Sequence, residues 1–169
     1  DAGFHYPYYL YVPSPYGEWK KRVPILVESS NSRRNSDDFS YHKEEARQLV
    51  TNQWPRKLAD RLGVPLLVPI FPRPQSEPVT SRYFTQQLDR DTLQIKNGPL
   101  ERIDKQLINM VDDARKRLSE NSFPVQEKII LDGFSSSGVF VNRFSMLHPK
   151  RILSVTAGGI NGMAILPKA

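Results

Sequence analysis

The sequence predicts an α/β protein, in which a mostly parallel β-sheet carries helices on both faces in a three-layer arrangement. Short unbroken apolar runs, typical of strands buried on both faces of a parallel sheet, recur along the chain. They alternate with stretches of helical periodicity, the order that produces parallel sheets covered by helices. With 169 residues the chain is long enough for one sizeable core and too short for two, so we expect a single domain over residues 1–169.

The first two strands are expected near the start of the chain. Residues 6–16 are rich in Tyr and Pro, and β propensity favours a strand over Tyr8–Val12 that the prolines confine to a sheet edge. Pro24–Glu28 (PILVE) reads as a buried strand. The polar loop that follows, Ser29–Asp38, has strong turn chemistry and starts at the carboxyl edge of the sheet, where α/β folds place ligands. A solvated surface loop is the alternative.

A helix and a third strand follow. Lys43–Leu62 has helical periodicity, and Pro55 must kink this helix or split it in two. Gly63 is typical of a helix stop. Val64–Phe71 (VPLLVPIF) is then expected to be a third buried strand.

A long polar connection covers residues 72–100. Loops of this length are uncommon in compact domains and often carry function. Because it leaves the carboxyl end of a buried strand, we expect it to wall the same cleft as the Ser29–Asp38 loop; a purely structural flap is the alternative. Its candidate binding residues are Arg82, Tyr83, Phe84, Asp89 and Asp91, of which Tyr83 and Phe84 are expected to contact substrate.

The clearest helix in the sequence is Glu101–Glu120, whose apolar residues fall on one face as a core stripe. These residues are Ile103, Leu107, Met110, Val111, Ala114 and Leu118. A last strand is expected to begin at Ser154–Gly158.

Between these two elements lies the stretch that carries chemistry, Lys128–Met146. Ile129–Leu131 predicts a buried strand, GFSSSG a tight turn, and the following apolar residues a helix. A serine in a sharp strand-to-helix turn is the context of a nucleophile elbow. The strained backbone there requires small neighbours two residues before and after the serine. Gly133 and Ser137 meet this around Ser135, whereas centring the turn on Ser137 would put Val139 in a small-residue position. The alternative to a nucleophile elbow is a Gly/Ser-rich turn that binds a phosphate or no ligand at all.

Charge and composition favour some partners over others. The net charge is +6, but the basic clusters are scattered and lack the interleaved aromatics of single-strand binders, so nucleic-acid binding ranks last. Solvated surface charge is expected, with an acidic polymer left open. No apolar run approaches the roughly 20 residues that span a bilayer. There is no cysteine and no Met start; we expect a processed or excised chain, with a secreted or periplasmic location.

These pieces resemble the α/β-hydrolase superfamily, in particular bacterial secreted hydrolase-like proteins with LDGFSxSG and LDRDTL segments. The matching segments are Ile25–Asp38, Val64–Pro72, Leu88–Leu93, Leu131–Gly138 and Leu147–Arg151. The resemblance implies Ser135 as nucleophile and the Ser136 N–H as half of the oxyanion hole. It places Asn31 as the source of the other half, with Ser30 beside it as a substrate-binding residue, although the His-Gly signature of the family is absent there. It implies no metal and no organic cofactor.

The rest of a catalytic triad is missing from the sequence. In this superfamily an acid and then a His follow the serine, yet no Asp or Glu follows Ser135. His148 lies along the same helix, nearly 20 Å away at about 1.5 Å per residue, and we expect it to end that helix. His42 precedes the nucleophile and has a weak case as base, against a surface or helix N-terminal role. His5 lies near a terminus.

The resulting prediction is a serine hydrolase of small or polymeric carboxylic esters, or of peptide amides, with acid and base outside this chain. The alternative is a catalytically incompetent homologue that binds a carbohydrate or a cell-surface polymer. A chain about two-thirds of the usual size for this fold would lack its C-terminal strands. We therefore expect an exposed sheet edge after Ser154–Gly158 that takes either a second copy or the missing part.

Overall fold

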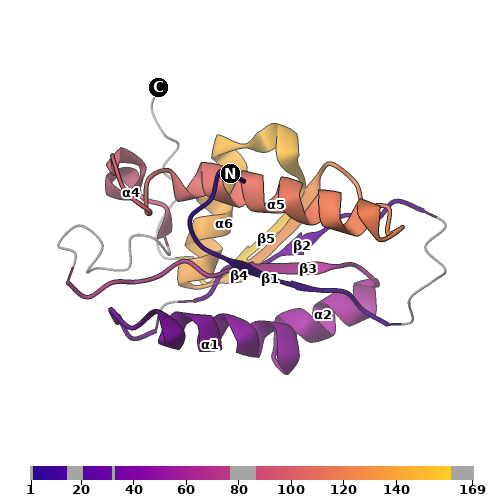
Figure 1. The fold of residues 1–169 in the computed structure, drawn as a ribbon, viewed down its shortest axis with the longest axis horizontal. Helices are drawn as coiled ribbons and strands as arrows, with labels where there is room; N and C mark the ends of the chain where they lie inside the picture. Colours follow the sequence, from indigo (N-terminus) through magenta and orange to yellow (C-terminus); the bar gives the residue numbers. More distant parts are fainter. Residues whose placement is uncertain (1, 15–20, 32, 77–86, 161–169) are drawn as a thin grey trace.

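The computed structural model describes residues 2–14, 21–31, 33–76 and 87–160. In these residues a five-stranded sheet has the order β1-β3-β2-β4-β5 (Figure 1). Its strands are β1 (Tyr8–Tyr11), β2 (Leu26–Val27), β3 (Leu66–Pro69), β4 (Ile129–Phe134) and β5 (Ile152–Gly158). Only the pairing of β1 with β3 is antiparallel; β3, β2, β4 and β5 run parallel. The expected fold class is therefore confirmed, with the Tyr-rich strand at a sheet edge.

The helices also follow the expected order. They are α1 (Phe39–Thr51), α2 (Trp54–Leu62), the short α4 (Arg90–Gln94), α5 (Ile103–Glu120) and α6 (Ser136–Leu147), with a 3₁₀ turn at Pro149–Arg151. The expected split at Pro55 occurs because this proline sits in the first turn of α2, where its missing N–H has no helical partner to lose. Gly63 ends α2 in the left-handed conformation, at φ 62°. Within the described residues no helix combines the length and apolarity needed to cross a membrane.

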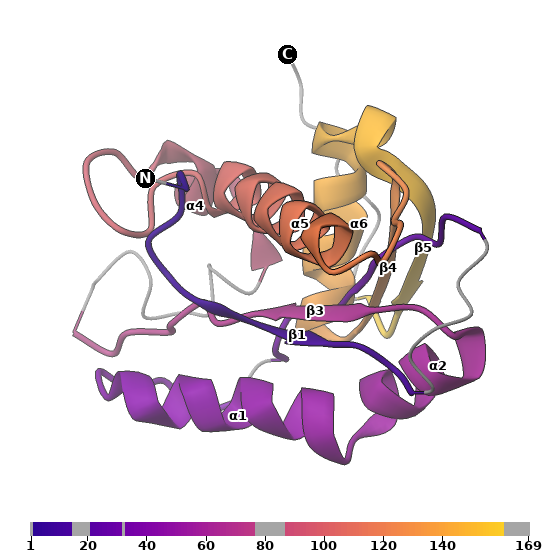
Figure 2. The same ribbon diagram turned by 45° about the vertical axis from the view of Figure 1, so that its right-hand side comes forward.

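The sheet lies between two helical layers. Helices α1 and α2 cover one face, and α5 and α6 cover the other (Figure 2). Side-chain alternation assigns the strand residues to these faces: Leu26 packs with α1 and α2, and its neighbour Val27 packs with α5 and α6. Both are fully buried, as expected for a strand covered on both sides.

The long connection between β3 and α5 is less irregular than the sequence suggests. It contains α4, which begins after Asp89; the Asp89 carboxylate accepts the Thr92 backbone N–H at 2.9 Å. Asp89 is thus an N-cap, and α4 carries the exposed Asp91 in its first turn. Residues 77–86, which include the candidates Arg82, Tyr83 and Phe84, lie outside the described residues.

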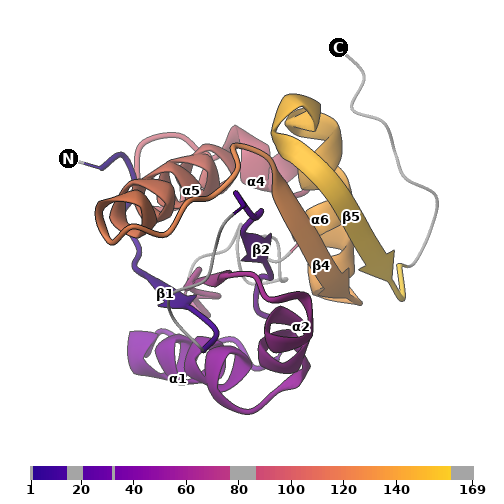
Figure 3. The same ribbon diagram turned by 90° about the vertical axis from the view of Figure 1, so that its right-hand side faces the viewer.

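Strand β5 forms the outer edge of the described sheet (Figure 3). Its seven residues carry no charge and no proline, although natural edge strands usually carry such protection against pairing. Leu153 is 51% exposed and Val155 is 39% exposed. An antiparallel pairing of two β5 strands centred on Val155 would place Ser154 opposite Thr156 of the other copy. It would also keep the Lys150–Arg151 ends of the two copies apart, whereas a parallel pairing would bring these like charges together.

We expect the isolated 169-residue chain to form a dimer through this edge. Val155→Lys should shift it to monomer, because two lysines would face each other at the centre of the pairing. Sedimentation velocity measures the change. Thr51→Lys, which adds the same charge on exposed α1, should leave the dimer intact; a monomeric wild-type chain would contradict the expectation.

Candidate active site

The turn between β4 and α6 has the strained geometry that a nucleophile elbow requires. Ser135 has φ 59° and ψ −121°, a region that side-chain-bearing residues rarely occupy. Its backbone N–H donates to the Gly158 carbonyl at 2.8 Å, which fixes the turn to the end of β5. No hydrogen bond of its hydroxyl is found among the described residues, and the side chain is half-buried. The hydroxyl is therefore available at the carboxyl edge of the sheet.

Two glycines allow this turn to be so tight. A Cβ on Gly133 would lie 2.6 Å from the Ser137 carbonyl oxygen, and one on Gly138 would lie 2.5 Å from the Gly158 carbonyl oxygen. Both distances are too short for real contacts, and both partners are backbone. Gly133 thus has the role that the sequence predicts. Gly138 has a different one: it lets α6 pack directly on β5.

Ser137 braces the turn from inside. It is buried, and its hydroxyl accepts the Phe134 N–H and donates to the Phe134 carbonyl, both at 2.9 Å. These bonds occupy the hydroxyl and close the turn on itself. The alternative centred on Ser137 therefore lacks an available hydroxyl, whereas Ser135 has one.

The two residues expected to form an oxyanion hole lie next to each other. The backbone N–H of Ser136, at the start of α6, donates to the Asn31 side-chain oxygen Oδ1 at 3.2 Å. An N–H at a helix N-terminus favours negative charge. In this structure Asn31 faces that N–H with an acceptor, so its side chain stands where an oxyanion would bind.

A buried arginine holds the Asn31 loop in place. Arg73 follows β3 and is fully buried. Its guanidinium donates to the Asn31 carbonyl at 3.2 Å and to the Arg34 carbonyl at 3.3 Å, and it forms an ion pair with Glu45 of α1. A buried charge that loses such a partner is strongly destabilising, so this contact fixes the loop to α1.

The Ser29–Asp38 loop is consequently less exposed than a solvated surface loop. Ser29 is 4% exposed and Ser30 is 7% exposed. Ser30, expected to contact substrate, therefore lies largely beneath the surface because the loop is drawn inward by Arg73. The alternative of a solvated surface loop therefore does not hold for this first part.

His42 belongs to the same buried cluster. It lies in the first turn of α1 and is 2% exposed. Its Nε2 is 2.9 Å from the Ser36 carbonyl oxygen and 3.3 Å from the Arg73 backbone nitrogen. The expected helix N-terminal position is found, but the side chain is interior, and none of its contacts within the described residues reaches Ser135. His5, the residue near the terminus, donates its backbone N–H to Gln106 of α5 at 2.9 Å.

A His–Asp pair exists elsewhere in the fold. His148 ends α6, as expected, and its Nε2 lies 2.9 Å from Oδ2 of Asp104. The 12-residue helix α6 separates it from Ser135 by about 18 Å at roughly 1.5 Å per residue. This pair therefore connects α6 to α5 and is too far from Ser135 to exchange a proton with it.

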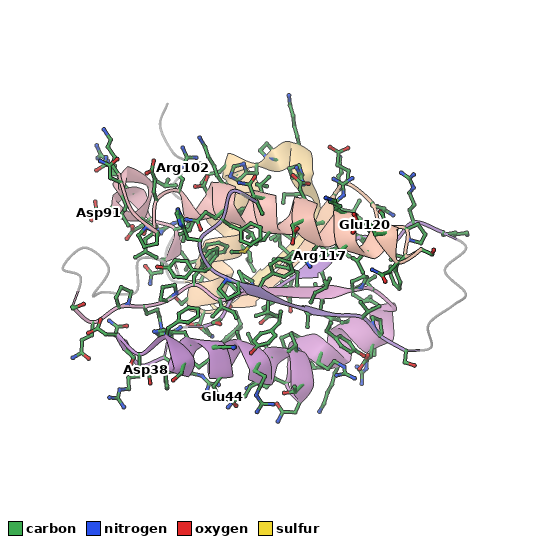
Figure 4. All side chains as sticks on the ribbon, in the orientation of Figure 1. Asp38, Glu44, Asp91, Arg102, Arg117 and Glu120 are labelled. Atoms are coloured by element: carbon green, nitrogen blue, oxygen red, sulfur yellow. The ribbon has the colours of Figure 1, made fainter. Side chains whose placement is uncertain are left out.

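Asp104 is the anchor of that connection. It is fully buried and accepts two hydrogen bonds from Arg102, at 2.8 and 2.7 Å (Arg102 is labelled in Figure 4). Burial by itself would raise the pKa of Asp104, but the hydrogen bonds from Arg102 and His148 outweigh it and hold the pKa below the usual range. The ionised carboxylate is thus the form that stabilises the fold.

Asp104→Asn should lower the free energy of unfolding at pH 7 by about 3 kcal/mol, because it leaves buried donors without their anion. Since the folded-state pKa is depressed, the contribution is present above the unfolded-state pKa and is lost as pH falls through the folded one. Urea unfolding at pH 7 and pH 3 measures both effects. The variant should lose less stability on acidification than wild type, and Asp91→Asn, at an exposed position (Figure 4), should behave as wild type.

A second acidic pair lies under the elbow. Glu28 follows β2 and Asp132 lies in the adjacent strand β4, and their side chains hydrogen-bond to each other. Burial and then the neighbouring Asp132 raise the pKa of Glu28 to about 8, and burial raises that of Asp132. The pair therefore holds a shared proton near neutral pH. The sequence signal for this pair is an acidic residue at the end of each apolar run: Glu28 ends ILVE and Asp132 ends IILD.

Glu28→Gln should remove a pH dependence of stability. Because the pKa of Glu28 rises from 4.5 to about 8 on folding, wild type should lose stability as pH rises through this window, by up to about 1.4 kcal/mol per pH unit. Thermal unfolding from pH 5 to pH 9 measures it. Relative to wild type the variant should gain stability with rising pH, whereas exposed Glu127→Gln should not; parallel curves would contradict the shared proton.

No group of three His, Asp or Glu side chains is arranged to hold a metal ion within residues 2–14, 21–31, 33–76 and 87–160. The Glu28–Asp132 pair and the contacts of His42 and His148 each bring together at most two His, Asp or Glu side chains.

Comparison with known proteins shows a likeness of fold to several solved structures. No protein-family model matches the sequence, and no curated protein matches it. The structure is similar to poly(aspartic acid) hydrolase-1 from Sphingomonas sp. KT-1, with a TM-score of 0.56 and 20% identity over 89% of this chain and 49% of that one.

Two other solved structures show the same likeness. A poly(3-hydroxybutyrate) depolymerase from Bordetella parapertussis has a TM-score of 0.52 and 20% identity, over 93% of this chain and 47% of that one. An S-formylglutathione hydrolase from Agrobacterium tumefaciens has 0.53 and 13%, over 88% and 50%. The α/β-hydrolase type of fold is thus confirmed, and the chain spans about half the length of these structures.

Proposed function

We propose that this chain carries the nucleophile of a serine hydrolase that acts on carboxylic esters. The observation that carries the proposal is Ser135, held in a strained strand-to-helix turn with a helix N-terminus beside it and with no hydrogen bond of its hydroxyl to any described residue. Strain of this kind persists only where the surrounding structure fixes it, and it is concentrated at functional sites. The likeness of fold to a poly(3-hydroxybutyrate) depolymerase and an S-formylglutathione hydrolase supports this proposal at the level of fold.

In the proposed reaction the Ser135 oxygen attacks the ester carbonyl carbon. A C–O bond forms to the serine, the carbonyl electrons move onto oxygen, and the serine proton passes to a base. The Ser136 N–H stabilises the oxyanion. Collapse of this intermediate breaks the bond to the alcohol, which leaves with a proton, and water then releases the acid from the serine.

The base and its acid partner are proposed to come from outside these 169 residues. The chain has three histidines; of these, His42 is held in the buried Arg73 cluster and His148 is tied to Asp104. A serine without a general base is a weak nucleophile, and such a base contributes roughly 10²–10⁴-fold. We therefore expect low activity from the chain alone.

Asn31 has to move for this chemistry to occur. Its Oδ1 accepts the Ser136 N–H in this structure, and that N–H must be released before it donates to an oxyanion. Rotation of the side chain releases it, and the Asn31 backbone, held by Arg73, is left as the proposed source of the second donor. Amide bonds are the alternative substrate class, supported by the poly(aspartic acid) hydrolase among the neighbours.

A fluorophosphonate probe tests the nucleophile, because attack by serine forms an O–P bond and expels fluoride. We expect slow labelling of the purified chain at Ser135, located by peptide mass mapping, and faster labelling with imidazole as an added base. Ser135→Ala should abolish it. Ser145→Ala, on the same helix, should not change it. Labelling at Ser137, or equal labelling of Ser135→Ala, would contradict the assignment.

The second candidate is a non-catalytic module that binds a carbohydrate or a cell-surface polymer on the same fold. It is favoured because His42 and His148 are held in structural contacts. None of these contacts, within the described residues, involves Ser135. If imidazole does not accelerate labelling at Ser135 and the chain is retained on a polysaccharide column, this candidate replaces the hydrolase.

A further inference from the structure

Two basic segments that lie far apart in the sequence meet at one pocket. The pocket has a volume of about 540 Å³ and lies at the C-terminal end of α5; Figure 4 labels Arg117 and Glu120 in this part of the helix. We call it the basic pocket. Its polar lining is Arg22, Asp112, Arg115, Lys116, Ser119 and Ser122, and residues 123–125 form an apolar wall.

Positive charge exceeds negative charge in the basic pocket. Its carboxylate, Asp112, is shared: it accepts Arg115 at 3.1 Å and Arg151 at 2.5 and 3.2 Å. Lys116 has a distant contact of 3.9 Å with Glu120. No ion pair of Arg22 is found within the described residues. One carboxylate thus serves two guanidiniums, so positive charge is in excess among the described residues that line the pocket.

The remaining polar groups of the pocket favour donation. The Arg115 Nε is covered and has no hydrogen-bond partner among the described residues, an arrangement that is costly unless a ligand or a small movement satisfies it. At the end of α5 the carbonyls of Arg117, Leu118 and Ser119 accept the N–H groups of Asn121, Ser122 and Phe123. The Ser119 and Ser122 side chains add hydroxyls.

We propose that the basic pocket binds a phosphate group. Arginine matches tetrahedral oxyanions through its planar set of donors, and here Arg115 and Arg22 would flank the group with Lys116 as a third charge. The site is separate from Ser135. Val125, which lines the pocket, pairs with Val23 before the start of β2 and β4, whereas Ser135 follows the end of β4. Binding here is therefore independent of the proposed hydrolase.

A titration of the ¹⁵N-labelled 169-residue chain with inorganic phosphate, at constant ionic strength set by chloride, tests the proposal. We expect saturable shifts at the Ser119 and Ser122 amides and at the Arg115 Nε–H. Arg115→Gln and, separately, Arg22→Gln should each weaken binding at least about fivefold. A parallel titration with glycerol 3-phosphate distinguishes free phosphate from a phosphate monoester by which ligand binds more tightly.

Arg117→Gln is the matched control. It removes the same charge two residues along the helix, where Arg117 pairs with Asp113 at 2.7 Å outside the pocket. It should leave phosphate binding unchanged. Linear, unsaturable shifts, or equal weakening by Arg117→Gln, would overturn the proposal and show general charge screening only. Arg22 lies before β2 and outside the helices, so its variant keeps the test valid if Arg115→Gln fails to fold.

Discussion

The structure of the candidate site depends on how closely α6 approaches the ends of β4 and β5. The Gly158 carbonyl accepts the Ser135 N–H, and it lies where any side chain on Gly138 would have to be. Since backbone meets backbone on both sides, the turn has little room to relax. Ser137 adds an internal brace through Phe134. The strain at Ser135 is thus maintained by three neighbouring segments rather than by the local sequence alone.

Much of the fold could be predicted from local patterns. The apolar runs PILVE and VPLLVPIF, the stripe on α5 and the break at Pro55 each correspond to an observed element. The reason is that burial on two faces and helical periodicity leave direct marks in the order of residues. The sharp strand-to-helix turn was predictable because the glycine and serine residues stand between a short apolar run and a stretch of helical periodicity.

The electrostatic part of the site was not predictable in the same way. Arg73, Glu45 and His42 come from three elements, and no spacing rule shows that the loop Ser29–Asp38 folds inward over a buried guanidinium. The Glu28–Asp132 pair needed the strand order, because β2 and β4 are neighbours in the sheet but far apart in the chain. Likewise, Arg22 and Arg115 appeared as scattered charges until the fold brought them to one pocket.

The Gly158 contact also has a consequence for biosynthesis. A polypeptide grows from its N-terminus, and Ser135 emerges from the ribosome well before the residue whose carbonyl holds its backbone. Until β5 has been made and has joined the sheet, the turn has only its internal contacts between Phe134 and Ser137 and lacks the hydrogen bond from Ser135 to Gly158. The complete set of contacts that holds this turn is therefore acquired late, after the helical layers around it have their full sequence.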